Sequence, residues 1–231
     1  MWRFASAKNN RRMRQAEHQL DFGLGTNNDP VEMMPTHERL EMTDADVTIF
    51  RVFFNHAESD RFFSSLLNQT RWRQDKIRMY GKQINLPRLT AWYGDPGKSY
   101  TYSGISMDPD PWTETLLEIK SRVDREAQIR FNSVLLSLYR NGNDSLSWHQ
   151  DDEPELGEDP VIASVSFGAT RLFQFRYKPN KNLPKVTVDL THGSLLIMKG
   201  PTQRFWMHQV PKTSRPVDPR INLTFRVIQD Y

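Results

Sequence analysis

A histidine and an aspartate two residues apart, His149 and Asp151, have the types and spacing to bind a metal ion. On an extended strand, side chains i and i+2 point to the same face, so this imidazole and carboxylate can converge on one ion. A third ligand has to come from elsewhere. Among the six histidines, His208 is the best candidate, because it lies inside a predicted strand and the others lie in loops, at a helix start or near the N-terminus.

Two imidazoles and one carboxylate form the facial ligand set of non-haem Fe(II) oxygenases, which leaves positions open for a cosubstrate and oxygen. The same ligand types occur in zinc hydrolases. A loop histidine that is hydrogen-bonded to an acid gives the same short pattern, so this motif alone does not decide. The chain has no cysteine, which excludes disulfides, thiolate metal sites and a cysteine nucleophile.

The segment Arg220 to Arg226 adds a second chemical signal. On a strand, Arg220, Asn222, Thr224 and Arg226 share one face, and the other face is wholly apolar. Two arginines on a core strand are costly unless an anion pairs with them. That anion is either a structural carboxylate or a dicarboxylate such as 2-oxoglutarate, for which the bidentate geometry of arginine is well suited.

Charge is distributed unevenly along the chain, although the formal net charge is only +3. Residues 141–160 hold seven acids and no Lys or Arg, residues 161–231 hold eleven bases and three acids, and residues 71–98 hold seven bases and two acids. An acidic cluster between basic segments suits a metal site that handles an anionic substrate. Ordinary scatter of surface charge is the alternative.

The elements that must position these residues indicate an α+β fold. Helical periodicity covers residues 55–68 and 112–129, and strands are predicted at 47–50, 71–79 and 88–93. Seven short strands then follow between turn signals, at 131–139, 161–167, 171–177, 186–190, 194–198, 205–210 and 221–228. We expect a double-stranded β-helix (jelly roll), with the N-terminal helices covering one sheet.

Taken together, the sequence resembles the AlkB family of Fe(II)/2-oxoglutarate-dependent nucleic-acid demethylases, nearest the branch that prefers single-stranded DNA or RNA. The similarity extends collinearly over about residues 70–228. The matching stretches are Pro87–Gly94, Tyr100–Gly104, Trp148–Glu153, Ala163–Gly168, His192–Leu195 and Arg220–Arg226.

The resemblance implies roles for individual side chains. The iron ligands, and thus the catalytic centre, would be His149, Asp151 and His208. The residues that match 2-oxoglutarate-binding positions are Tyr139, Arg220 and Arg226, with Asn222 and Thr224 as lesser candidates. Ser137 stands where family members commonly have Asn, which shortens a side chain that usually contacts the cosubstrate.

Substrate contacts are also implied. Asp152 matches a family residue near the damaged base, and Tyr100 and Tyr102 fall in a lid that encloses it. Tyr80 would stack on a base, and the cations Lys82 and Arg88 would contact phosphates. Ordinary packing of the tyrosines and solvation of the two cations are the alternatives.

The resemblance divides the chain into a flexible basic segment, residues 1–45, and one dioxygenase domain, residues 46–231. Within the domain, residues 70–110 would form a nucleotide-recognition lid and residues 131–228 the jelly-roll core. No window approaches the roughly 18 apolar residues of a membrane span. We expect an intracellular monomer in the cytoplasm or nucleus, although the Arg-rich N-terminus is also compatible with a mitochondrial location.

The implied function is that of an Fe(II)/2-oxoglutarate-dependent dioxygenase. It would use O₂ to demethylate 1-methyladenine and 3-methylcytosine in single-stranded DNA or RNA, and also in duplex DNA, releasing formaldehyde, succinate and CO₂. Two alternatives remain at this point: an oxygenase that acts on protein or a small molecule, and a non-catalytic nucleic-acid-binding module.

Overall fold

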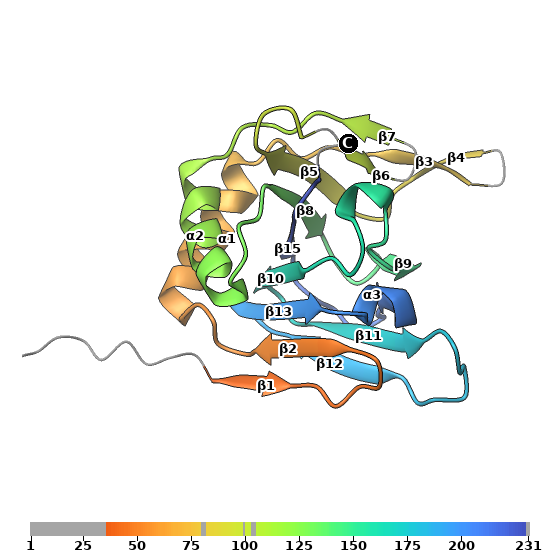
Figure 1. Cartoon of the computed structure of the whole chain (residues 1–231). Coiled ribbons are helices and arrows are strands. Elements are labelled where there is room, and N and C mark those ends of the chain that lie inside the picture. The colour runs from red at the N-terminus through yellow and green to blue at the C-terminus, as the bar shows by residue number, and fades with distance from the viewer. Residues whose placement is uncertain (1–35, 80–81, 99, 103–104, 230–231) are drawn as a thin grey trace, which may run out of the picture. The chain divides into compact units, whose positions relative to one another are not determined.

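The computed structural model describes residues 36–79, 82–98, 100–102 and 105–229, with side chains described outside 77–82 and 99–107. The chain divides into two units, Met1–Met34 and Pro35–Tyr231, and every described element belongs to the second. Within this unit, two antiparallel sheets lie one over the other, and two long helices flank the larger sheet (Figure 1).

The larger sheet has seven strands in the order β1-β2-β13-β10-β15-β8-β5, and all neighbours in it are antiparallel. Its strands are β1 (His37–Arg39), β2 (Asp46–Phe50), β13 (Ser194–Lys199), β10 (Ile162–Gly168), β15 (Arg220–Arg226), β8 (Ser133–Tyr139) and β5 (Leu89–Gly94).

The smaller sheet has four strands in the order β12-β11-β14-β9, and a short helix, α3 (Thr202–Phe205), precedes β14. Its strands are β12 (Val186–Leu190), β11 (Arg171–Tyr177), β14 (Trp206–Val210) and β9 (Leu146–His149). The remaining elements are the hairpins β3 (Lys76–Met79) with β4 (Lys82–Asn85) and β6 (Tyr100–Tyr102) with β7 (Ile105–Met107), and the 3₁₀ turn η1 (Pro154–Leu156).

Helices α1 (His56–Gln69) and α2 (Glu114–Ala127) cover the outer face of the larger sheet. Helix α1 starts at a capping box in which Asn55 accepts from the Glu58 N–H and the Glu58 carboxylate accepts from the Asn55 N–H. Buried side chains from both helices form one cluster with alternate residues of the sheet, such as Val165 and Leu223. The prediction that N-terminal helices cover one sheet is confirmed.

A second core fills the space between the sheets. It contains Leu135, Leu196 and Met198 from the larger sheet and Phe173 and Val210 from the smaller one. The polar residues of the C-terminal strand face this space, while its apolar residues face the helices, as the alternation predicts. The jelly-roll prediction is therefore confirmed in its main feature, a two-sheet core with the expected polar side chains turned inward.

Two expectations need correction. Strand β1 lies within the segment expected to be flexible, because it pairs in register with β2 despite its short, polar sequence His37-Glu38-Arg39. The strand expected over residues 71–79 begins only at Lys76, where it forms one arm of the β3–β4 hairpin. None of the described helices is long and apolar enough to cross a membrane.

Candidate metal centre and its pocket

The two predicted histidine ligands lie on neighbouring strands of the smaller sheet. His149 ends β9, and His208 on β14 is its direct partner in the strand register. The ring centroids are 4.2 Å apart and the ring planes are tilted by 70°. Residues 59 positions apart in sequence are thus brought together by one pair of antiparallel strands.

Asp151 completes the group. It lies two residues after the end of β9, and its Oδ2 lies 3.5 Å from His208 Nε2. One ligand atom from each of His149, Asp151 and His208 lies within 4.8 Å of the others. Asp151 and His208 are only 2% and 3% exposed. We call this group the pocket cluster.

Two side chains hold Asp151 in place: Gln203, which the sequence did not single out, and Arg226, for which a structural carboxylate was one of the two predicted partners. The Asp151 N–H donates to Gln203 Oε1 at 3.0 Å, and Gln203 is 1% exposed on α3. Arg226 donates from Nη2 to Asp151 Oδ1. Burial alone would raise the pKa of Asp151, but Arg226 and the two imidazoles outweigh it and hold the pKa below its usual range. The carboxylate is therefore ionised.

His149 has the protonation state that a metal ligand requires. His149 Nδ1 lies 2.9 Å from the Ser147 carbonyl oxygen, so Nδ1 carries the proton and Nε2 keeps its lone pair. Burial lowers the pKa of His149 to about 3, and the neighbouring His208 adds to this effect. At neutral pH the His149 ring is neutral.

This donor set fits a divalent metal ion. It offers an imidazole nitrogen with a free lone pair, a second imidazole and an ionised carboxylate on one side of a pocket, as a facial Fe(II) site requires. The buried His208 Nδ1 has no hydrogen-bond partner in the described part of the chain. His149, Asp151 and His208 would hold the metal.

The predicted cosubstrate residues lie on the inner faces of two paired strands, β8 and β15. Ser137 lies opposite Asn222 in the register, and Tyr139 lies opposite Arg220. The pocket that contains the three metal-binding candidates is also lined by further polar side chains, namely Arg88, Ser137, Ser164, Asn222, Thr224 and Arg226.

Arg220 is suited to bind an anion. Its side chain is fully buried, and Nη2 donates to Ser166 Oγ at 2.9 Å. The Nε and Nη1 donors have no hydrogen-bond acceptor within the described residues. Burial lowers the pKa of Arg220 to about 10, with Tyr139 opposing the shift, so the guanidinium stays charged at neutral pH. A buried charge with unused donors is costly unless a ligand such as a carboxylate satisfies it.

Arg88 requires a correction. The sequence predicted a phosphate contact at the surface, but Arg88 is 1% exposed and lines the pocket beside His149. Its Nε donates to Ser137 Oγ at 3.3 Å. The side chain is buried because it lies on the same strand face as Thr90 and Trp92, which also point between the sheets. The shared strand face of Arg88, Thr90 and Trp92 was the sequence signal that could have predicted the burial of Arg88.

The other predicted substrate contacts stay predictions. Asp152 is exposed next to the pocket cluster and accepts a hydrogen bond from Gln150 Nε2. Tyr80 lies outside the described residues. Lys82 begins β4, and Tyr100 and Tyr102 lie on β6, but these three side chains are also outside the described part of the chain.

Arg171, which the sequence did not single out, fixes the loops around the pocket. Its guanidinium is 3% exposed and donates to the carbonyl oxygens of Asn141, Asp144 and Pro211. The loop before β9 and the loop after β14 are thereby tied together. Since these strands carry His149 and His208, Arg171 stabilises the frame of the pocket cluster.

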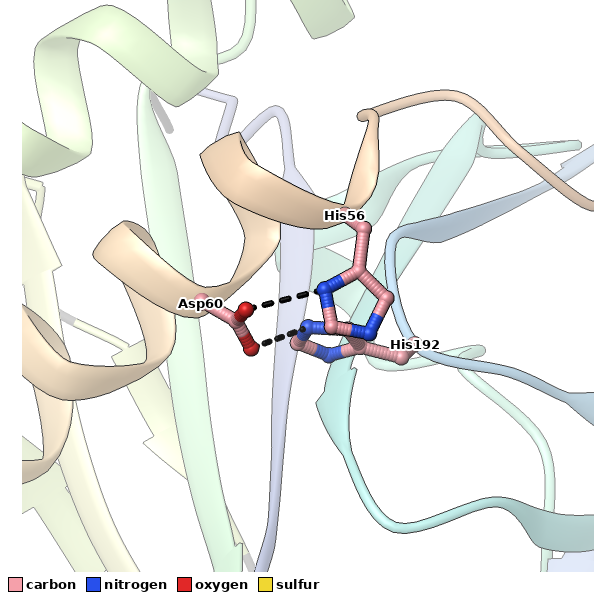
Figure 2. A group of neighbouring side chains, drawn as sticks. All are labelled: His56, Asp60 and His192. Atoms are coloured by element: carbon pink, nitrogen blue, oxygen red, sulfur yellow. Dashed lines mark hydrogen bonds and ion pairs between the residues drawn. The ribbon is translucent and has the colours of Figure 1, made fainter.

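A second group of the same residue types lies at the surface. Figure 2 shows Asp60 of α1 between His56, one turn earlier, and His192 of the β12–β13 turn. Asp60 Oδ2 is 2.9 Å from His56 Nδ1, and Oδ1 is 3.2 Å from His192 Nε2. The sequence did not predict this group, because His192 is more than 130 residues from the other two. We call it the surface cluster.

Comparison with known proteins places these observations in context. The sequence profile of the 2OG-Fe(II) oxygenase superfamily matches residues 46–226. Alpha-ketoglutarate-dependent dioxygenase alkB homolog 3 is 45% identical to the chain over 184 residues in Bos taurus and 43% identical over 190 residues in Homo sapiens. These matches cover 76% and 79% of this chain, but 64% and 66% of the relatives.

A further relative is matched over most of its length. DNA oxidative demethylase ALKBH2 from Mus musculus is 40% identical over 201 residues, which cover 83% of each protein. Among solved structures, OsALKBH1 superposes with a TM-score of 0.56 at 17% identity, covering 83% of this chain and 100% of that one. At that identity the structural likeness supports the fold alone.

Proposed function

Since the chain belongs to the AlkB family within the 2OG-Fe(II) oxygenase superfamily, we propose that it oxidatively demethylates N-alkylated nucleobases. The substrates would be 1-methyladenine and 3-methylcytosine in single-stranded DNA or RNA, and also in duplex DNA. The products would be the restored base, formaldehyde, succinate and CO₂.

One observation carries this proposal. The inner faces of β9, β14 and β15 bring a two-histidine, one-carboxylate ligand set and an arginine-lined pocket into the same space between the sheets. A metal hydrolase needs the ligands but has no use for a dicarboxylate pocket beside them. The two features together favour an oxygenase that consumes 2-oxoglutarate.

Different residues of the chain would bind the metal, bind the cosubstrate and exclude water. His149, Asp151 and His208 would hold Fe(II), which together with 2-oxoglutarate and O₂ supplies the oxidant for the N-methyl group. Arg220 would offer two unused donors to the cosubstrate, Arg226 keeps the Asp151 carboxylate ionised, and Gln203 accepts a hydrogen bond from the Asp151 N–H. The walls of the pocket, including Phe173 and Met198, restrict the access of water to the centre.

Electrostatics favour the proposed lesions. Methylation at N1 of adenine or N3 of cytosine makes the ring cationic, and a nearby carboxylate stabilises a cation. Asp152 follows the ligand Asp151 directly and is exposed, so it is available to a base that enters the pocket. A single strand also spares the cost of unpairing the target base.

The competing hypothesis is an oxygenase of the same family that acts on protein or a small molecule. The discriminating experiment compares formaldehyde release from matched single- and double-stranded DNA and RNA, each carrying one lesion, with release from the methylated free bases. The proposal predicts turnover that depends on 2-oxoglutarate and is greatest with a single-stranded oligonucleotide. Equal or greater turnover of the free bases would contradict it.

The preference for one polymer, the monomeric state and the compartment stay predictions. Sedimentation of the iron-loaded protein would test the oligomeric state directly. Mass spectrometry of the reacted oligonucleotides would identify the lesion range, because each removed methyl group lowers the mass by a known amount.

A further inference from the structure

Two cationic side chains lie against a tryptophan ring on the outer face of the smaller sheet. The Arg176 guanidinium carbon lies 4.5 Å from the centre of the Trp148 ring, and Lys185 Nζ lies 5.5 Å from it. Trp148 comes from β9, Arg176 from β11 and Lys185 from the residue before β12. Three neighbouring segments thus contribute to one surface, which we call the cation–Trp surface.

The charges of this surface are not neutralised. In the described part of the chain, neither Arg176 nor Lys185 has a carboxylate within ion-pair distance, and the Arg176 Nη2 contact is to the Met207 sulfur at 3.4 Å. A cation–π contact orients a cation but leaves its full charge available to an anion. Trp148 therefore positions two cations without cancelling either.

The surrounding hairpin adds to the positive potential. Lys178 and Lys181 are exposed in the loop between β11 and β12, and residues 171–188 contain no acid. Asp189 follows four residues after Lys185 on the extended β12 strand, which corresponds to about 13 Å. At that separation, physiological salt screens most of its effect at the surface.

The cation–Trp surface is close to the metal centre in the chain. Trp148 directly precedes His149, but only His149 lines the pocket, while the Trp148 ring contacts Arg176 and Lys185. A polynucleotide whose base enters the pocket has to pass near β9. Its flanking phosphates are then within reach of long cationic side chains on the same sheet.

Resting on the proposed function, we propose that the cation–Trp surface binds the phosphodiester backbone next to the target base, with Arg176 and Lys185 as the phosphate contacts. Each contact replaces condensed counterions on the strand, so it contributes to affinity in a salt-dependent way and without regard to base sequence. The occupant is a single strand of nucleic acid rather than an acidic protein, because both cations are presented by the sheet that carries two of the metal-binding candidates.

The test measures the affinity of the iron-loaded protein with 2-oxoglutarate under argon for a labelled single-stranded DNA carrying one 3-methylcytosine. The dissociation constant is determined between about 50 and 200 mM salt. Relative to wild type, Arg176→Gln and Lys185→Gln should each weaken binding several-fold. Each should also reduce the slope of log K against log salt by about 0.7, the value for one phosphate contact on a single strand.

The matched control is Arg125→Gln, which removes one exposed cation from α2, on the helix-covered side of the larger sheet. Its slope should equal that of wild type. If the Gln variants melt at a lower temperature than wild type, Arg176→Met and Lys185→Met, which keep an uncharged aliphatic side chain against the Trp148 ring, replace them as the test, and these should show the same reduction in slope. A slope that is the same in the Arg176, Lys185 and Arg125 variants overturns the inference while leaving the proposed function intact.

Two further outcomes are informative. Wild-type protein that binds no oligonucleotide refutes the proposed function, and the inference falls with it. Poly-glutamate that displaces the oligonucleotide at an equal concentration of charges overturns the assignment to a phosphodiester and indicates an acidic protein partner. Failure of poly-glutamate to compete supports the assignment.

Discussion

The pocket cluster and the surface cluster contain the same residue types, two histidines and one aspartate, but they differ in what the Nδ1 atom of one histidine contacts. In the pocket cluster, His149 Nδ1 faces a carbonyl oxygen and carries the proton. In the surface cluster, His192 Nδ1 accepts a hydrogen bond from the Gly168 N–H at 2.8 Å. The proton of a neutral His192 must therefore lie on Nε2, the atom that faces Asp60.

This difference bears on whether His192 can bind a metal. A neutral imidazole binds a metal through the nitrogen that has no proton, and its other nitrogen normally donates to an acceptor. His149 meets this requirement. His192 could bind through Nε2 only by losing its last proton or by giving up the bond from Gly168. The surface cluster consists of a hydrogen bond within α1, between His56 and Asp60, and a 3.2 Å contact between Asp60 and His192 Nε2 that joins α1 to the β12–β13 turn, as Figure 2 shows.

The two aspartates also differ in how exposed their side chains are. The Asp151 side chain is 2% exposed, and Arg226 and Gln203 orient it. The Asp60 side chain is 63% exposed, and its partners in the cluster are the two histidines. Residue types at short distance are thus insufficient evidence for a metal site, because the groups behind the ligands fix their protonation and orientation.

Replacing one histidine in each cluster tests this comparison with the largest expected effect. His208→Ala removes a buried ligand candidate and should abolish 2-oxoglutarate-dependent formaldehyde release and lower bound iron to well below one per chain. His192→Ala should retain iron and most of the activity, because the neutral His192 carries its proton on Nε2, the nitrogen that would have to bind a metal there. Metal content is measured by atomic absorption alongside turnover.

Zinc provides the reverse test of the surface cluster. If His208→Ala protein still binds one zinc ion tightly, and the additional change His192→Ala removes it, the tautomer argument is wrong and the surface cluster is a metal site. Wild-type iron content in His208→Ala alone would instead contradict the assignment of the pocket cluster.

Substitution of Gln203 tests the comparison with an intermediate expected effect. Gln203→Leu keeps much of the volume but leaves the Asp151 N–H without its acceptor, so the carboxylate should lose its orientation. Partners behind metal ligands commonly contribute 10- to 100-fold in metal affinity, and we expect a weakening of about that size. Titration with Co(II), followed by its visible absorption, reports the ligand geometry independently of turnover.

The control for Gln203 is a second substitution at the same position. Gln203→Glu preserves the length and the accepting oxygen, and should restore Co(II) affinity toward the wild-type value if the accepted hydrogen bond is the cause. Equal loss in both variants would show that Gln203 acts through packing against Met198, which its Nε2 contacts, and not through Asp151.

The sequence predicted those features that follow from local periodicity. The alternation in residues 220–226 correctly separated the pocket face from the helix face, and the spacing of Phe62 and Leu66 predicted α1. Arg88 was predicted at the surface because its side chain is charged. Its position on a strand face that points between the sheets was not taken into account. The acceptor role of Gln203 has no local signature, since any side chain in the fold can meet a backbone N–H.

The surface cluster was equally hidden from the sequence, because its contact joins a helix start to a turn far along the chain. The β1 strand escaped prediction for a different reason. Three polar residues carry no periodic signal, and β1 forms only because the edge of β2 offers free backbone groups. Contacts with other segments, rather than composition, determine both features: a distant turn for the surface cluster and the neighbouring strand β2 for β1.

Asp60→Asn tests the comparison with the smallest expected effect. The amide keeps an oxygen at the position that lies 3.2 Å from His192 Nε2, and the exposed contact with His56 is of the kind that contributes between about 0 and 1 kcal/mol. We therefore expect the free energy of unfolding to fall by less than about 1 kcal/mol, with iron content and turnover unchanged, as measured by urea denaturation and the formaldehyde assay.

His192→Ala should lower the free energy of unfolding by more, about 1–3 kcal/mol, because it leaves the Gly168 N–H without an acceptor. A larger loss of unfolding free energy in Asp60→Asn than in His192→Ala would mean that the Asp60 carboxylate holds the cluster together. The hydrogen bond from Gly168 would then not be what fixes the His192 ring.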